Sequence, residues 1–243
     1  MVEVNAVMQA TKSQIETSVL SSSDDKLRMS LLGQQYVADW RYLLMASGRL
    51  WRGHIGTLTA GAAPGLITGG GAGTTIDSDQ PEFIIGVGAA YYLIPIEVKV
   101  SCVVDLDANA EIGEILLFAD RTQAPPAAAT GTPGDVVPVN QLDGAGDFPG
   151  DAWGGVTTDI TDPVMSELLD HVTVSASEFV SNGTATNLTN GIVIPMRMDW
   201  KSQHPLLLAG PCSLVMFYGG TAAVTGMASV VVGAVPTSWF PVS

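Results

Sequence analysis

The apolar positions between residues 49 and 240 form short runs that are separated by turn-forming residues. The runs cover 49–58, 83–107, 111–121, 156–179, 190–200, 205–219 and 227–240. Their lengths and their content of Val, Ile, Leu and Thr are typical of strands, and Gly- and Pro-rich segments lie between them. We therefore predict an all-β fold with about eight strands, which suits a two-sheet sandwich.

The longest run, 83–107, has two internal features. Ala89-Ala90 marks a break between two strands, and Pro95, which lacks a backbone donor, predicts an edge or a bulge. The run 156–179 predicts one or two strands together with a helical turn over 165–171. The segments 60–82 and 122–151 are rich in Gly, Ala and Pro and are predicted to be loops.

Residues 1–49 differ from the rest of the chain and carry the best helical signals. Ser and Asp at 21–25 are N-cap candidates, Leu27 and Leu31 follow at helical spacing, and Gly48 is a suitable stop. These signals predict a helix within 24–46, or an extended arm with short helical turns, because Gly33 interrupts the segment. We therefore divide the chain into an N-terminal arm, 1–49, and one domain, 50–243.

Three aromatic residues of the arm, Tyr36, Trp40 and Tyr42, are candidate assembly residues. Exposed aromatic side chains suit contacts with a neighbouring subunit. They equally suit packing on the arm's own domain, and the sequence leaves both interpretations open.

Composition and charge exclude several classes of protein. With 47% hydrophobic and 14% charged residues, the 243-residue chain can bury a large core and is not a disordered linker. Its net charge is −14 and its basic residues do not cluster, so we predict no direct sequence-specific binding of nucleic acid. Residues 1–52 carry a net charge of +1 and the remainder −15.

Cysteine content and hydropathy bear on the compartment. Cys102 and Cys212 are too few for a disulfide scaffold and are predicted to be small buried hydrophobes, with a single disulfide as the alternative. The N-terminus shows no basic segment followed by an apolar one, so we expect synthesis in a cytoplasm. Prolines and glycines interrupt the uncharged stretch after Lys201, which predicts buried strands there.

Catalytic signatures are not visible in the sequence. His54, His171 and His204 lie in separate predicted elements, and no H-E-x-x-H, C-x-x-C or G-x-S-x-G motif occurs. We predict that the protein is not an enzyme and has no catalytic cofactor.

An acidic pattern begins at Asp105 and places oxygen ligands at alternating positions, at Asp107 and Asn109, as a calcium loop does. The pattern then departs from that loop, with Ala110 at its sixth position and Leu116 at its twelfth. Two interpretations stay open: a structural Ca²⁺ held by Asp105, Asp107 and Asn109 together with carboxylates of a neighbouring subunit, or a solvated turn.

The stretch YYLIPIEVKVSCVVDLDANAEIGEILLFADR, the preceding arm and the hydrophobic ending PTSWFP resemble single jelly-roll viral capsid (coat) proteins. The resemblance implies an eight-stranded jelly-roll sandwich with an N-terminal, extended or partly helical arm. Without a basic arm, the chain is closer to capsid proteins of tailless icosahedral, membrane-containing viruses of bacteria and archaea. In those viruses subunits stand on an internal lipid membrane, so the implied partners are many copies of itself, a second capsid protein and that membrane.

These observations lead to two functional hypotheses. The first is a structural virion protein, a major capsid subunit that is assembled in the host cytoplasm into an icosahedral shell. A low charged fraction favours it, because protein surfaces normally carry many charges unless they become interfaces. The alternative is a carbohydrate- or receptor-binding β-sandwich module, such as a virion spike or decoration protein, or a lectin.

Overall fold

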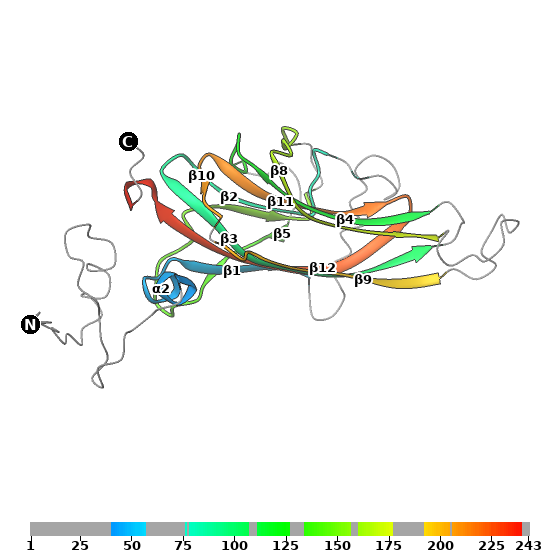
Figure 1. Cartoon of the computed structure of the whole chain (residues 1–243), viewed down its shortest axis with the longest axis horizontal. Coiled ribbons are helices and arrows are strands. Elements are labelled where there is room, and N and C mark those ends of the chain that lie inside the picture. Colours follow the sequence, from blue (N-terminus) through cyan, green and yellow to red (C-terminus); the bar gives the residue numbers. More distant parts are fainter. Residues whose placement is uncertain are drawn as a thin grey trace, which may run out of the picture.

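The structure is a computed structural model that describes residues 40–56, 76, 78–106, 111–126, 134–156, 160–176, 192–204 and 206–239. The prediction of an all-β fold is confirmed, because the described chain is mostly strand (58%) in two antiparallel sheets, with little helix. Figure 1 shows the two sheets as stacked layers, with the helix α2 beside one end of the lower layer.

The described part of the chain contains one α-helix, twelve strands and a short 3₁₀ helix. Three of the strands are only two residues long. In chain order the elements are α2 (Trp40–Ala46), β1 (Leu50–Ile55), β2 (Phe83–Val87), β3 (Tyr91–Leu106), β4 (Ile112–Asp120), β5 (Gly134–Asp135), β6 (Val139–Asn140), β7 (Gly150–Gly154), β8 (Glu167–Ser175), β9 (Ile192–Lys201), β10 (Leu208–Ala209), β11 (Cys212–Gly220), β12 (Ala223–Pro236) and η3 (Thr237–Trp239).

The two sheets are named after their central strands. The β12 sheet has the order β10-β3-β12-β1-β6, and β9 also pairs with β3. The β11 sheet has the order β5-β7-β2-β11-β4-β8. The longer strands pair from the two ends of the described chain inward: β1 with β12, β2 with β11, β3 with β9 and β4 with β8.

The main core fills the space between the sheets. Alternate residues of each strand point inward, as the period of two in a strand requires. Fully burying one such aliphatic or aromatic side chain stabilises the fold by about 1.5–3 kcal/mol. The buried inward residues include Trp51, Ile85, Val100, Val104, Ile115, Leu117, Leu214, Met216, Tyr218, Val230 and Val232.

A β-bulge in β3 changes which residues of that strand face the core. Val232 pairs with Pro95 and the next residue of β12, Val231, pairs with Glu97, so Ile96 is the extra residue. The bulge lies beside Pro95, where the sequence predicts an edge or a bulge. It lets Leu93 and Val98, which are five positions apart, both point inward, while Ile96 packs on the outer side of the sheet.

Loops close the outer face of the β11 sheet. Val215 and Phe217 of β11 point outward but are buried there with Phe118, whose ring stacks on Phe217 at 5.8 Å. The buried carboxylate of Asp120 accepts hydrogen bonds from the backbone N–H groups of Thr122 and Val164 and so fastens two of the covering segments. This sheet is therefore buried on both faces over its centre.

Two local predictions are wrong. Residues 165–171, predicted as a helical turn, include the start of β8, whose pairing with β4 outweighs the local helical spacing. The predicted loop 122–151 contains β5, β6 and the start of β7. Its glycines allow strands to approach closely, since a Cβ on Gly150 would collide with the backbone oxygen of Gly86 on β2.

Other local predictions correspond to described features. Ala89-Ala90 forms the turn between β2 and β3, and β1 begins at Leu50. Cys102 and Cys212 are both buried and unbridged, and burial raises the pKa of the Cys102 thiol to about 12 and of the Cys212 thiol to about 11. Among the described residues no helix has the length and apolar character needed to span a membrane.

The bulge makes single-residue deletions in β3 unequal. Deleting Ile96 leaves the pairing of Val231 with Glu97 and of Val232 with Pro95 in place, and should cost about 1.5–3 kcal/mol of unfolding free energy for the lost burial. Deleting Val98 turns either Glu97 or Lys99 toward the core and should prevent folding. Thermal unfolding followed by circular dichroism compares the two variants, and an equal loss of stability would contradict the bulge.

Candidate functional site

The outer face of the β12 sheet is the candidate functional surface, and it has two parts. Near the start of β1, α2 covers the sheet, as Figure 1 shows. Further along the same strands, the side chains of β1, β12, β3 and β9 that point outward are largely exposed. The two parts differ in chemistry, because the covered part is apolar and the open part is charged.

Helix α2 packs on the sheet through Leu44, the one residue of the helix that is buried. Leu44 lies among Ile94, Ile96 and Val231. The helix approaches closely because β12 has a glycine beneath it: a Cβ on Gly233 would lie 2.8 Å from a methyl carbon of Leu44. The outward apolar residues of β3 and β12 are thus covered where α2 lies.

A polar contact fastens the start of α2 to the domain, and a backbone hydrogen bond with a glycine closes its other end. Near its start, the guanidinium of Arg41 donates to the backbone carbonyl of Ser202, just after β9, at 3.0 Å. At its end, the backbone N–H of Arg49 donates to the carbonyl of Leu44 at 2.8 Å, and Gly48 has a φ of 66°. Glycine adopts this left-handed backbone conformation without strain, and Gly48 ends the helix where the sequence predicts a stop.

The structure describes two of the three aromatic residues predicted for the arm. Trp40 is partly buried against the cluster around Leu44, so it packs on its own domain. Tyr42 is 47% exposed and points away from the cluster's buried residues. Tyr36 lies outside the described residues, as do residues 24–39 of the predicted helical region. Contact of this arm with a neighbouring subunit therefore stays a prediction.

The predicted calcium ligands are described only in part. Asp105 lies near the end of β3, exposed, between Ala223 of β12 and Val193 of β9. Asp107 and Asn109 lie outside the described residues. Within the part of the chain that the structure describes, no three His, Cys, Asp or Glu side chains gather as a metal site would require. Ca²⁺ bound between subunits stays a prediction.

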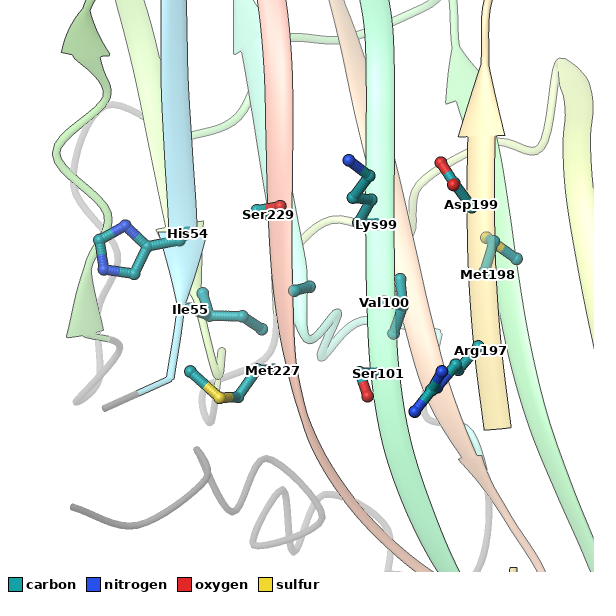
Figure 2. A pocket seen from close by; sticks show the side chains of 11 residues that line it. His54, Ile55, Lys99, Val100, Ser101, Arg197, Met198, Asp199, Met227 and Ser229 are labelled. Carbon is teal, nitrogen blue, oxygen red and sulfur yellow. The ribbon is translucent and has the colours of Figure 1, made fainter. Parts of the chain in front are cut away.

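The open part of the β12 sheet carries polar side chains in rows across four strands. One row consists of His54 on β1, Ser229 on β12, Lys99 on β3 and Asp199 on β9, each paired with the next. The adjacent row contains Met227, Ser101 and Arg197, again in register. Figure 2 shows the two rows side by side on the same face. Most of the strands that carry these residues are far apart in sequence, and only the strand register brings the residues together.

Several charges on this face neutralise one another. The ammonium of Lys99 contacts the carboxylate of Glu97 at 2.7 Å, and the ammonium of Lys201 lies 3.4 Å from Asp199 and 4.0 Å from Glu97. The hydrogen bond to Glu97 is the main cause that raises the pKa of Lys99. Exposed pairs of this kind contribute little to stability, so they mainly set the charge pattern of the face.

The side chains of Arg197 and His54 have no ion-pair or hydrogen-bond partner among the described residues. They lie on opposite sides of a hollow of about 560 Å³ in this face. The small side chains of Ser101 and Ser229 lie between these two residues in the lining of the hollow. The hollow therefore offers the guanidinium of Arg197 on one side and the imidazole of His54 on the other, while the carboxylate of Asp199 in its lining is paired with Lys201.

This face gathers most of the described basic residues of a strongly negative protein, together with the carboxylates of Glu97, Asp105 and Asp199. Four of the seven described Lys and Arg residues lie on it, at positions 52, 99, 197 and 201, and the other three are Arg41, Arg49 and Arg121. Of the last three, Arg121 is paired with Glu167 on the edge of the β11 sheet. The sequence does not indicate this cluster, because its members lie on three strands that are far apart in the chain: residue 52 is on β1, 99 on β3, and 197 and 201 on β9.

A second unforeseen feature is the buried carboxyl group of Glu82, just before β2. The backbone N–H groups of Glu82 and Tyr218 donate to it, while its Oε2 has no hydrogen-bond partner among the described residues. Burial outweighs those hydrogen bonds and raises the pKa of Glu82 well above its ordinary value. Its charge in turn contributes to the raised pKa of the Cys102 thiol and the Tyr218 hydroxyl, for which burial is the larger cause.

The three histidines lie apart from one another. His54 is on β1, His171 is on the edge strand β8 where its ring contacts the hydroxyl of Thr173 at 2.8 Å, and His204 follows β9. Their positions show no shared cleft with Glu82, which lies in the core.

Comparison with known proteins finds no matching protein-family model and no curated protein sequence that is significantly similar. The chain's own geometry is therefore the basis of the functional argument that follows.

Replacing Glu82 by Gln should change the pH dependence of stability. Because burial raises the pKa of Glu82 in the folded state, the unfolded chain ionises first as the pH rises above about 4.5. The wild-type protein then loses up to about 1.4 kcal/mol of unfolding free energy per pH unit until the folded pKa is reached. Glu82→Gln lacks this loss, so its melting temperature should exceed that of the wild type increasingly from pH 5 upward.

The control is Glu114→Gln, which removes the same charge from a half-buried position on β4. Its difference from the wild type should stay nearly constant over the same pH range. Parallel melting curves for the wild type and Glu82→Gln would contradict the buried, protonated state of Glu82.

Proposed function

We propose that this protein is a structural subunit of a virus particle, a major capsid protein whose copies assemble into an icosahedral shell. The single observation that carries the proposal is the order in which the long strands pair. The pairs β1·β12, β2·β11, β3·β9 and β4·β8 nest inside one another and alternate between the two sheets. Jelly rolls, a sandwich architecture used by capsid subunits, have eight strands in two sheets arranged in this way.

On this proposal the eight strands of the jelly roll are β1, β2, β3, β4, β8, β9, β11 and β12. The remaining longer strand, β7, extends the β11 sheet beside β2. The short strands β5, β6 and β10 lie at or near the sheet edges. They are local additions and leave the nested order unchanged.

Exposed aliphatic side chains support a role in assembly. At the β6 edge, Val137 is 74% and Val139 60% exposed, and on β9 at the opposite edge Val193 is 61% exposed. Apolar side chains at opposite edges of one domain are suited to contacts with copies on both sides. Such contacts are what a closed shell of identical subunits requires.

The carbohydrate-binding alternative finds less support. Sugar sites commonly use exposed aromatic rings as stacking platforms. Among the described residues, Tyr42 on α2 is the one aromatic side chain that is largely exposed; Trp40 is partly buried and Trp51 is fully buried in the core. The exposed hydrophobic residues are otherwise aliphatic, which favours protein contacts. We therefore place the protein in the virion, after assembly in the host cytoplasm.

Electron microscopy and light scattering of the purified full-length chain test this proposal. We expect closed shells or regular arrays above a threshold concentration. Removal of residues 1–38 keeps α2 and its cover over Ile94, Ile96 and Val231, so the truncated chain should keep its melting temperature. Because it lacks the rest of the predicted arm, it should lose or alter assembly.

A longer truncation, residues 1–46, serves as the comparison because it also removes α2. It should lower the melting temperature, since it uncovers the apolar cluster around Leu44. Full-length protein that stays monomeric at every concentration, or that binds glycans as a small oligomer, would contradict the capsid assignment. Normal particles from the shorter truncation would reject the role of the arm.

A further inference from the structure

We propose that the hollow on the outer face of the β12 sheet binds the acidic loop 141–148 of a second copy of this chain. This inference rests on the proposed function, because it identifies the contact by which neighbouring subunits join. The contact would be heterologous: the hollow of one copy receives the loop of the next, whose own hollow is left for a third.

The hollow carries the positive side of this contact. The guanidinium of Arg197 and the imidazole of His54 line it without side-chain partners among the described residues. Lys99 and Asp199 line it as well, and each is already engaged in an ion pair, Lys99 with Glu97 and Asp199 with Lys201. Serines 101 and 229 add hydroxyl groups that can donate to a carboxylate. Arginine binds a carboxylate through two parallel N–H groups, which suits a fixed docking position.

The loop carries the negative side. Its exposed carboxylates, Asp143 and Asp147, are separated by the small residues Gly144, Ala145 and Gly146. No ion pair or hydrogen bond engages either carboxylate among the described residues. A Cβ at Gly144 or Gly146 would meet nothing within 4 Å, so these two glycines border open space.

The loop is held in one shape before any partner binds. The side chain of Asn140 accepts from the backbone N–H of Leu142 at 2.9 Å and donates to the carbonyl of Gly146 at 3.1 Å. The indole N–H of Trp51 donates to the same carbonyl of Gly146 at 3.3 Å. A loop ordered in this way loses little conformational entropy on docking.

The positions of the two partners favour contact between copies. The loop follows β6 and lies at one edge of the β12 sheet, whereas Arg197 is on β9 at the opposite edge. Within one subunit, β1, β12 and β3 separate them. Repeating the same contact from copy to copy therefore gives a closed ring where the rotation between copies closes, and an open filament where it does not.

Exposed apolar residues accompany the charges on both sides. Val137 and Val139 precede the loop, and Met227 and Val103 lie on the sheet face beside the hollow. Burying these side chains would supply the non-directional part of the binding energy, and the charge pattern would set the register. The net charge of −14 opposes non-specific association of copies, because like charges repel.

A charge exchange tests the contact. We expect Arg197→Glu alone, and Asp143→Arg or Asp147→Arg alone, to raise the concentration needed for assembly by about tenfold or more. A chain that combines Arg197→Glu with Asp143→Arg or with Asp147→Arg should return to within about threefold of the wild type. Assembly is measured by sedimentation velocity and electron microscopy, and circular dichroism verifies that each variant is folded.

Arg121→Glu is the matched control. It makes the same change of charge at an exposed arginine on the other sheet, and its assembly should be that of the wild type. Two outcomes with an assembling wild type would show that the loop does not occupy the hollow: single variants that assemble as well as the wild type, or a failure of both combinations to restore assembly. In either case the capsid proposal stands. If the wild type itself remains monomeric, both proposals are overturned.

Discussion

The apolar layer between the two sheets is the interaction on which the rest of the structure depends. From β1 to β4, each strand lies in the opposite sheet from the strand before it, so neighbours in the chain are joined by packing and not by a shared hydrogen-bond ladder. The ladders instead join strands that are far apart in sequence, such as β1 with β12. Neither sheet can therefore form from a local hairpin alone, and side chains such as Leu214 and Val232 must come together as the ladders form.

Features that depend on a few neighbouring residues could be predicted from the sequence. Ala89-Ala90 interrupts an apolar run and forms the turn between β2 and β3, and Pro95 marks the bulge in β3. Prediction was wrong where the local pattern competes with pairing. Residues 165–171 have helical spacing, but β4 provides a ladder for them, and β8 forms instead. The glycine-rich composition of 122–151 predicts a loop, although its small residues allow close strand contact and β5, β6 and the start of β7 form there.

The candidate surface could not be predicted, because it depends on register between distant strands. His54, Lys99 and Asp199 fall in one row only after four strands have been paired, and no spacing along the chain indicates this row. The same is true of Glu82, which precedes an apolar strand and looks like an ordinary acidic loop residue. Its burial results from the enclosing strand β11, which is more than 100 residues away.

The place of β12 has a consequence for the order of events during synthesis. This strand lies in the middle of its sheet, between β1 and β3, yet among the described long strands it leaves the ribosome after all the others. The rows of side chains on the outer face are incomplete until it is inserted. A growing chain therefore cannot present the finished face to completed subunits nearby, and translation itself keeps unfinished copies out of any assembly that uses this face.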